Sequence, residues 1–141
     1  MADQRDNLDA GGLPVGAPFH AEFEITPRDA KAALDAGRVL LVDVRTQPEW
    51  DLVHVPGSLH IPLDQIADRH DEIEPRPGQR VVLLCHHGRR SLDAANVLRA
   101  TGRPDLADSK SVAGGIELWS LSADAAVPRY ERGPGVLRLR G

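Results

Sequence analysis

The sequence predicts an α/β fold in which helices cover both faces of a parallel sheet. Two continuous apolar runs, Val39–Asp43 and Val81–Leu84, have the length of strands and lack the alternation of a half-exposed strand. Segments of helical spacing alternate with these runs, which is typical of a parallel sheet. Sheets of this kind bind ligands at the carboxyl ends of their strands, and Cys85 directly follows the second run.

Two helices have clear start and stop signals. Thr26 can cap the first helix, Pro27 suits its first position, and Gly37 ends it. The second helix is indicated by the helical spacing of Leu92–Ala100, and Gly102 terminates it. We therefore expect one helix before the first apolar run and one after Cys85.

Shorter patterns complete the expected order of elements. Ser58–Ile61 has the pattern of a short strand, and Leu63–Arg69 that of a short helix. A further strand is expected at Ser111–Val112, where the chain enters the Gly114–Gly115 turn.

The length of 141 residues fits one domain, and no internal repeat is visible. Residues 1–20 mix Asp, Gly and Pro without periodicity, so we expect a flexible N-terminal arm there. Residues 131–141 have no clear partner element and are expected to form a C-terminal tail. The folded domain is thus expected to span residues 21–130.

The composition is that of an ordinary globular protein, with 41% hydrophobic and 27% charged residues. The net charge is −4 and the basic residues are scattered, which disfavours nucleic acid and anionic membranes as partners. No apolar run approaches the roughly 20 residues that cross a bilayer. The segment Met1–Ala10 lacks the basic-then-apolar order of a secretory signal, so we expect a cytoplasmic protein.

The chain contains one cysteine, Cys85, which excludes a disulfide within these residues. A lone thiol is either a small buried hydrophobe or a nucleophile. Cys85 ends an apolar run, which fits the first interpretation, but the residues that follow it, His86 to Arg90, fit the second.

The second interpretation rests on the chemistry of a loop that opens a helix. The unpaired N–H groups and the positive dipole end of that helix stabilise negative charge on a sulfur. Gly88 allows a positive φ, so successive amides can converge on one anion, and Arg89 and Arg90 add fixed positive charge. His86 and His87 either line the entrance or face solvent. Such a loop could hold a sulfur-donor anion, a persulfide and a departing sulfite.

Three separated motifs carry a resemblance to a known family. Cys85–Arg90 resembles the active-site loop Cys-x-x-Gly-x-Arg of the rhodanese family. Leu41–Arg45, Glu49–Trp50 and His54–Ser58 are similar to the upstream signature of that family, and Val112–Trp119 is similar to its closing Gly-Gly-x-x-x-Trp motif. The order and spacing agree from about residue 25 to residue 130. Two departures, Val53 for a usual Gly and Ser58 for Ala, leave the cysteine loop unchanged.

The resemblance implies the rhodanese-like three-layer fold, a five-stranded, mainly parallel sheet flanked by helices. It also implies transfer of a sulfane sulfur from thiosulfate or a persulfide donor through a Cys85 persulfide. The substrate-binding loop then comprises His86, His87, Gly88, Arg89 and Arg90. Asp43 and Arg45 follow the neighbouring strand and are expected to support this loop, with Arg45 paired to Glu49. We expect no metal and no other cofactor.

The expected donor is a small sulfur-bearing anion. Because no second cysteine is present to receive the sulfur, the acceptor must be external, either a thiol or a sulfur-carrier protein. The stretch Val127–Tyr130 is similar to rhodanese modules found at the C-termini of adenylyltransferases that supply sulfur, which favours a carrier protein.

Alternative interpretations use other features of the same sequence. A non-catalytic rhodanese module would act only as a binding or sulfur-carrier partner, but such modules typically lose the cysteine. A related phosphatase or arsenate reductase would need the wider loop Cys-x5-Arg, and position 91 is Ser91. Zinc is disfavoured because Cys85, His86 and His87 are consecutive and cannot easily surround one tetrahedral ion. His54 is expected to make local backbone hydrogen bonds, and Trp50 and Trp119 to pack in the core or a pocket wall.

Overall fold

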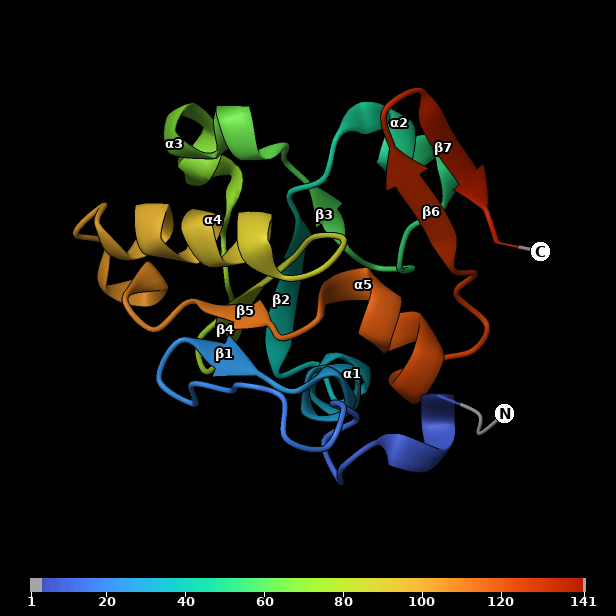
Figure 1. Ribbon diagram of the computed structural model, residues 1–141. Coiled ribbons are helices and arrows are strands. Elements are labelled where there is room, and N and C mark those ends of the chain that lie inside the picture. Colours follow the sequence, from blue (N-terminus) through green and yellow to red (C-terminus); the bar gives the residue numbers. More distant parts are fainter. Residues whose placement is uncertain (1–3, 141) are drawn as a thin grey trace.

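A five-stranded parallel sheet forms the centre of the protein (Figure 1). It is described here from a computed structural model that covers residues 4–140. The strand order is β1-β5-β4-β2-β3, and each neighbouring pair is parallel. The strands are β1 (Glu24–Ile25), β2 (Val39–Asp43), β3 (Leu59–His60), β4 (Arg80–Leu84) and β5 (Lys110–Val112). The expected sheet is confirmed, including the two buried runs that form β2 and β4.

Helices cover both faces of the sheet and enclose two apolar layers (Figure 1). One layer joins the sheet to α1 (Pro27–Asp35), α5 (Gly115–Leu118) and the π-helical turn Trp119–Ala123. The other joins it to α3 (Ile66–Arg69) and α4 (Arg89–Arg99). The fold also contains α2 (Gln47–Leu52) after β2 and 3₁₀ turns at Gln4–Asn7, Leu63–Gln65, His70–Glu72 and Pro104–Leu106.

The helix boundaries follow from their caps. Thr26 caps α1 as expected, and its hydroxyl accepts a hydrogen bond from the N–H of Asp29 at 3.3 Å. Helix α4 begins at Arg89, three positions before the expected start at Leu92, because Gly88 is its N-terminal cap. The loop between Cys85 and α4 is therefore shorter than the sequence alone indicates.

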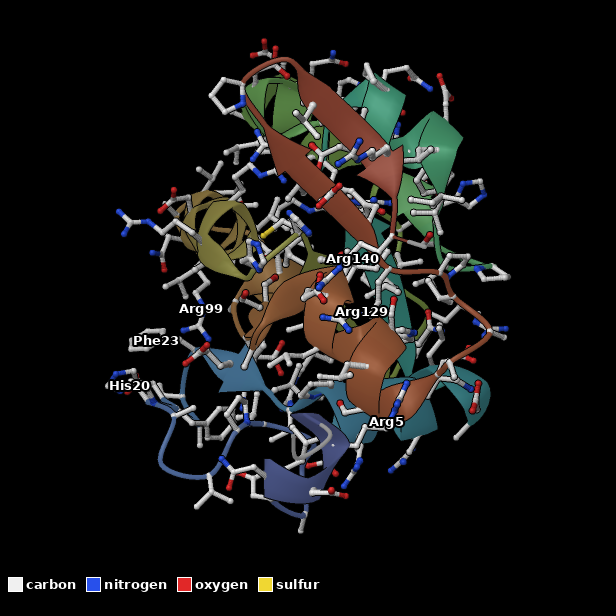
Figure 2. The ribbon with its side chains drawn as sticks, turned by 45° about the vertical axis from the view of Figure 1, so that its right-hand side comes forward. Arg5, His20, Phe23, Arg99, Arg129 and Arg140 are labelled. Carbon is white, nitrogen blue, oxygen red and sulfur yellow. The ribbon has the colours of Figure 1, made fainter. Side chains whose placement is uncertain are left out.

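The N-terminal segment, expected to be a flexible arm, makes defined contacts with the domain at Asp9, Gly11 and Leu13. Leu13 is buried, and Arg28 of α1 donates hydrogen bonds to the carbonyls of Asp9 at 3.0 Å and Ser122 at 2.9 Å. Further along, the guanidinium of Arg99 lies 4.9 Å from the ring centre of Phe23 (Figure 2). The expectation for residues 1–3 lies outside the described residues, and a domain boundary at residue 21 stays a prediction.

The C-terminal segment forms an antiparallel hairpin of β6 (Tyr130–Gly133) and β7 (Val136–Leu139). The expectation that residues 131–141 lack a partner element is therefore wrong for residues 131–140. Pro134 and Gly135 connect the strands, and Gly135 has φ +69°, which is the combination of a type II turn. The hairpin stands beside α2 at the carboxyl end of the sheet (Figure 1).

Candidate active site

Cys85 lies where β4 ends and the loop to α4 begins, at the carboxyl end of the central strands. Its side chain is 1% exposed and packs in the apolar layer between the sheet and α4. Cys85 thus occupies the expected position at the end of β4, but its side chain is buried and does not face an open pocket.

Two donors lie within hydrogen-bonding distance of the sulfur. The N–H of Gly88 points to Cys85 Sγ at 3.1 Å, and Ser91 Oγ lies 3.2 Å from it. Ser91 Oγ is also 2.7 Å from Ser111 Oγ. A thiolate can only accept hydrogen bonds, so the Ser91 hydroxyl can donate to a charged sulfur or to the carbonyl of Gly88, which lies 3.2 Å from Ser91 Oγ. When Ser91 donates to the sulfur, the contact between the two serines requires Ser111 to donate to Ser91.

The loop conformation depends on Gly88, which has φ +104°. Its N–H reaches the sulfur from this left-handed conformation, which residues with a Cβ rarely adopt. A Cβ on Gly88 would also lie 3.1 Å from the backbone nitrogen of Gly114. The expected role of Gly88 in curling the loop fits this geometry.

Backbone N–H groups at the start of α5 donate hydrogen bonds to backbone carbonyls of the same loop. Ile116 donates its N–H to the carbonyl of Cys85 at 2.8 Å, and Glu117 donates to that of His86 at 3.1 Å. Gly115 makes this approach possible, because a Cβ there would come within 2.5 Å of both carbonyl oxygens. The Gly-Gly-x-x-x-Trp motif therefore anchors the cysteine loop as well as closing the fold.

Glu49 connects the loop to the C-terminal hairpin. Its carboxylate is 1% exposed and accepts two hydrogen bonds from Arg90, at 2.7 and 2.9 Å, and one from the hydroxyl of Tyr130 at 2.5 Å. Arg132 of β6 lies 3.5 Å away. Burial raises the pKa of Glu49, but the hydrogen bonds from Arg90 and Tyr130 outweigh it and hold that pKa well below its usual range.

Arg45 and Asp43 form a fully buried ion pair at the carboxyl end of β2. Arg45 Nη2 lies 2.7 Å from Asp43 Oδ2, and the same nitrogen donates to the carbonyl of Val53 at 2.7 Å. The expected ion pair between Arg45 and Glu49 is wrong, because Arg45 meets the backbone carbonyl of Glu49 at 3.4 Å while its carboxylate is occupied by Arg90. Asp43 and Arg45 thus fasten α2 to the sheet, and they support the loop through Glu49.

The remaining loop side chains lie in different surroundings. His86 is 5% exposed, stacks on Tyr130 with ring centres 4.3 Å apart, and has its Nε2 3.6 Å from Glu117. Burial, with the neighbouring His87, lowers the pKa of His86 to about 4. His87 is exposed, and the side chain of Arg89 is 87% exposed.

Neither arginine of the loop is hydrogen-bonded to the sulfur. Arg90 is directed at Glu49, although it is close enough to interact electrostatically with Cys85. Arg89 faces solvent and lies 3.7 Å from Asp93. Backbone and hydroxyl donors therefore surround the sulfur more closely than the two expected cations do.

Two cavities adjoin the loop. One of about 670 Å³ is bordered by Arg90, Thr46, His60 and Leu63. The other, of about 380 Å³, lies between His86, His87 and the hairpin. Arg129 and Arg140 border this second cavity, and both lie over α5, where they pair with Glu117 (Figure 2). Among residues 4–140, no group of three or more His, Cys, Asp or Glu side chains gathers in a way that could hold a metal ion.

Comparison with known families agrees with this geometry. The family model described as Rhodanese-like domain matches residues 26–122. The chain belongs to the rhodanese-like domain family. This match confirms the resemblance carried by the three sequence motifs.

The relatives include sulfurtransferases of two sizes. The rhodanese-like chain is 39% identical over 100 residues to "Thiosulfate sulfurtransferase GlpE" of Pseudomonas syringae, covering 70% of this chain and 88% of that protein. It is 28% identical over 127 residues to "Adenylyltransferase and sulfurtransferase UBA4" of Yarrowia lipolytica, covering 90% of this chain but 31% of that protein. The chain therefore spans about a third of the length of this larger relative.

Solved structures show the same fold. The rhodanese-like domain protein from Staphylococcus aureus superposes with a TM-score of 0.61 at 28% identity, covering 74% of this chain and 95% of that one. Within residues 4–140, no helix has the length and apolar character that a membrane span requires.

Sequence reasoning missed three side chains of the site. Ser91 was considered only as the residue that excludes a wider loop, although its place directly after Arg90 puts it in the first turn of α4, facing Cys85. Ser111 and Tyr130 come from β5 and β6, far along the chain, and only the sheet order and the hairpin bring them to the loop. No local pattern indicates either contact.

Proposed function

We propose that this protein is a sulfurtransferase in which Cys85 carries the transferred sulfur as a persulfide. The observation that carries the proposal is the placement of Cys85 Sγ, which has the Gly88 amide and the Ser91 hydroxyl within 3.2 Å at the start of a helix. Such donors stabilise a thiolate and any negative charge that develops on the sulfur. The similarity to a protein named as a thiosulfate sulfurtransferase supports the same chemistry.

In the first step the Cys85 thiolate attacks the outer sulfur of thiosulfate. A bond forms between the two sulfur atoms, and the bond between the two thiosulfate sulfurs breaks. Sulfite leaves with the electron pair of that bond. With a persulfide donor, the leaving group is the donor thiolate. No proton is transferred, so this step needs no general base.

In the second step an acceptor thiolate attacks the terminal sulfur of the persulfide, and Cys85 leaves as the thiolate. The Gly88 and Ser91 donors stabilise this leaving group as they stabilised the nucleophile. The 141 residues contain no second cysteine, so the acceptor is an external thiol or a sulfur-carrier protein. Similarity to a relative named as both adenylyltransferase and sulfurtransferase supports a carrier protein.

The burial of Cys85 adds a requirement for movement. At 1% exposure the sulfur leaves no room for an incoming donor. Groups that cover the sulfur must therefore shift before the donor can reach Sγ.

Intact-protein mass spectrometry after incubation with thiosulfate tests the proposal directly. The wild type is expected to gain the mass of one sulfur atom, and later addition of cyanide is expected to remove it. Cys85→Ala should show no gain, and Ser91→Ala should form the same adduct more slowly because the attacking thiolate loses one donor. Absence of an adduct with both thiosulfate and a persulfide donor would contradict the proposal and favour a non-catalytic binding module.

A further inference from the structure

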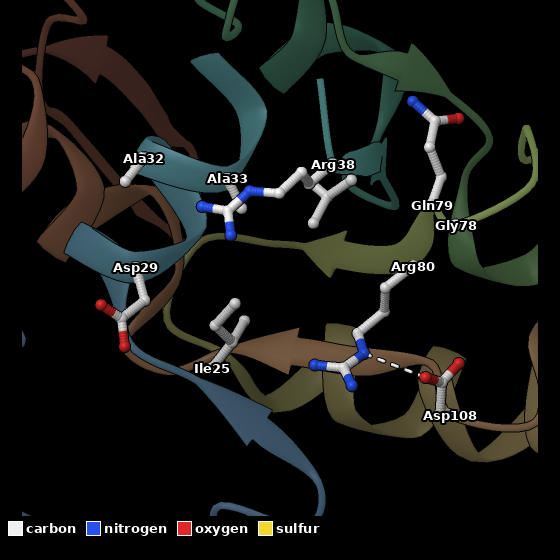
Figure 3. Close-up of a pocket in the computed structure, with 10 residues that line it drawn as sticks. Ile25, Asp29, Ala32, Ala33, Arg38, Gly78, Gln79, Arg80 and Asp108 are labelled. Atoms are coloured by element: carbon white, nitrogen blue, oxygen red, sulfur yellow. Dashed lines mark hydrogen bonds and ion pairs between the residues drawn. The ribbon is translucent and has the colours of Figure 1, made fainter. Parts of the chain in front are cut away.

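A separate cavity of about 530 Å³ lies beside the amino ends of β2 and β4, at the end of these strands opposite to Cys85 (Figure 3). Its volume is within the range of small-molecule sites, roughly 300 to 1,000 Å³. None of the residues that border it belongs to the cysteine loop or to the hairpin.

The inner wall of the cavity is apolar and is formed by small or branched side chains. Ile25 of β1, Val39 of β2 and Ala33 of α1 belong to the apolar layer on this face of the sheet. Because α1 presents Ala32 and Ala33 here, a space remains between the helix and the strands. The apolar layer therefore reaches solvent through this opening.

Two arginines lie at the rim because of the strand register. Arg80 pairs with Val39 across the sheet and donates its N–H to the carbonyl of Arg38 at 3.1 Å. In Figure 3 the Arg38 side chain reaches toward α1 and the Arg80 side chain toward the sheet edge, with Ile25 between their guanidinium groups. Both guanidinium groups border the same cavity, whose lining also includes the apolar side chains of Ile25, Ala33 and Val39.

The donors of these arginines are largely unused. The side chain of Arg38 makes no hydrogen bond or ion pair with the part of the chain that the structure describes. Arg80 contacts Asp108 through Nε at 3.1 Å, which leaves its two terminal nitrogens available among residues 4–140. A second carboxylate, Asp29, borders the cavity, but it is turned away from both guanidinium groups (Figure 3).

Further positive charge lies behind the rim. Burial together with the neighbouring Arg80 and Arg99 lowers the pKa of Lys110. The carboxylates of Asp108 and Glu22 act in the opposite direction on that pKa, so both signs of charge lie along this edge of the sheet.

We propose that this cavity binds a small organic anion, a molecule in which one carboxylate or phosphate group is attached to an apolar body. The anionic group is held by Arg38 and by the terminal nitrogens of Arg80, since guanidinium groups match both oxyanions geometrically. The apolar body lies against Ile25, Ala33 and Val39. This site is independent of the sulfurtransferase proposal.

Isothermal titration calorimetry of the full chain tests the proposal with four probes. These are hexanoate, hexyl phosphate, neutral hexanol and inorganic phosphate. We expect hexanoate or hexyl phosphate to bind at least tenfold more tightly than hexanol and inorganic phosphate, because only these two offer both an anion and an apolar body. The stronger of the two identifies the anionic group.

Three variants locate the binding. Arg38→Gln removes an exposed charge and should weaken binding about tenfold or more, the effect of losing a charge-assisted hydrogen bond. Ala32→Leu keeps both arginines, fills the opening and should abolish binding. Arg138→Gln, with a side chain 73% exposed on β7, is the matched control and should leave the affinity unchanged.

Several results would overturn the site. They are equal binding of hexanol and hexanoate, unchanged affinity in both Arg38→Gln and Ala32→Leu, or no binding of any probe. Loss of binding in Cys85→Ala, or competition by thiosulfate, would place the anion at the cysteine loop and would also contradict the proposal. Because Cys85→Ala should bind hexanoate normally, failure of the sulfurtransferase proposal leaves this test unaffected.

Discussion

The two ends of the central sheet both carry arginine–carboxylate pairs, but in opposite surroundings. At the carboxyl end, Asp43 and Arg45 have side chains that are 0% exposed, and the Glu49 side chain is 1% exposed. At the amino end, the side chains of Arg80 and Asp108 are 41% and 60% exposed. Similar chemical groups therefore have different consequences at the two ends.

This difference in side-chain exposure indicates how firmly each end of the sheet holds its charged groups. Loss of one partner of a buried ion pair strongly destabilises the folded protein, because the other charge is left buried and unpaired. A buried pair therefore holds its neighbours in one geometry. An exposed pair contributes little and exchanges partners readily. The carboxyl end is thus suited to hold a reactive sulfur in place, whereas the amino end is suited to accept an incoming ion. The following variants test this comparison.

Glu49→Gln should have the largest effect, because it leaves the half-buried Arg90 without a charged partner and replaces one of the two oxygens that accept hydrogen bonds from Arg90 and Tyr130. The free energy of unfolding should fall by about 3 to 5 kcal/mol. Urea denaturation followed by circular dichroism measures this change. Glu131→Gln, whose side chain is 45% exposed on the hairpin, is the control and should stay within about 0.5 kcal/mol of the wild type. Equal effects of the two variants would contradict the structural role of Glu49.

Gly115→Ala should lower the free energy of unfolding by about 2 to 4 kcal/mol, since the new Cβ combines a positive φ with a clash at the carbonyls of Cys85 and His86. Gly135→Ala is the matched control. Its φ of +69° is close to the +62° of Gly115, but its Cβ would meet nothing within 4 Å. Equal losses in urea melts would show that backbone conformation alone matters at Gly115.

The buried His86 should make stability depend on pH. Its pKa is about 4 in the folded protein and near its ordinary value of 6.5 in the unfolded chain, so the unfolded chain binds the proton first as the pH falls. Stability is therefore complete above about pH 6.5 and declines toward pH 4, by on the order of 2 kcal/mol between pH 7.5 and pH 5.

His86→Phe keeps an aromatic ring against Tyr130 and removes this titration. Urea midpoints of both proteins at pH 7.5 and pH 5 isolate the effect of His86, because Glu117, Glu49 and His87 remain in both. A wild-type loss no larger than that of the variant would show that His86 does not stay neutral in the folded protein.

The smallest effect is expected for Asp108→Asn at the amino end. It removes one partner of an exposed ion pair and should change the free energy of unfolding by less than about 0.5 kcal/mol. The change should shrink further as salt is added, because exposed charges are screened. A loss comparable to that of Glu49→Gln would remove the distinction between the two ends of the sheet.

Local patterns were sufficient to predict the main elements and the position of the cysteine loop. Each of these signals determines structure only within a few residues of itself. They are the apolar runs Val39–Asp43 and Val81–Leu84, the cap at Thr26 and the glycine at position 88. Contacts across the fold were not predictable in this way. Arg45 could face either Asp43 or Glu49, and only packing against Arg90 and Tyr130 decides between them.

The C-terminal hairpin illustrates a signal that was present but not used. Pro134 and Gly135 form a turn pair, and segments with β-forming residues flank them on both sides. The two strands have four residues each, and they pair with each other rather than with the central sheet. Tyr130 and Arg132 then bring the hairpin to Glu49, which the sequence does not indicate.

The elements that fasten the cysteine loop, α5 and the hairpin, follow it in the sequence and are therefore synthesised after it. Cys85 is synthesised before Ile116, Glu117 and Tyr130, which fasten the loop and the residues around it. Until those later residues emerge, the loop lacks its anchors and the thiol is open to oxidants and metal ions. The thiol is thus most vulnerable in the nascent chain, and a chain truncated before α5 would keep that vulnerability permanently.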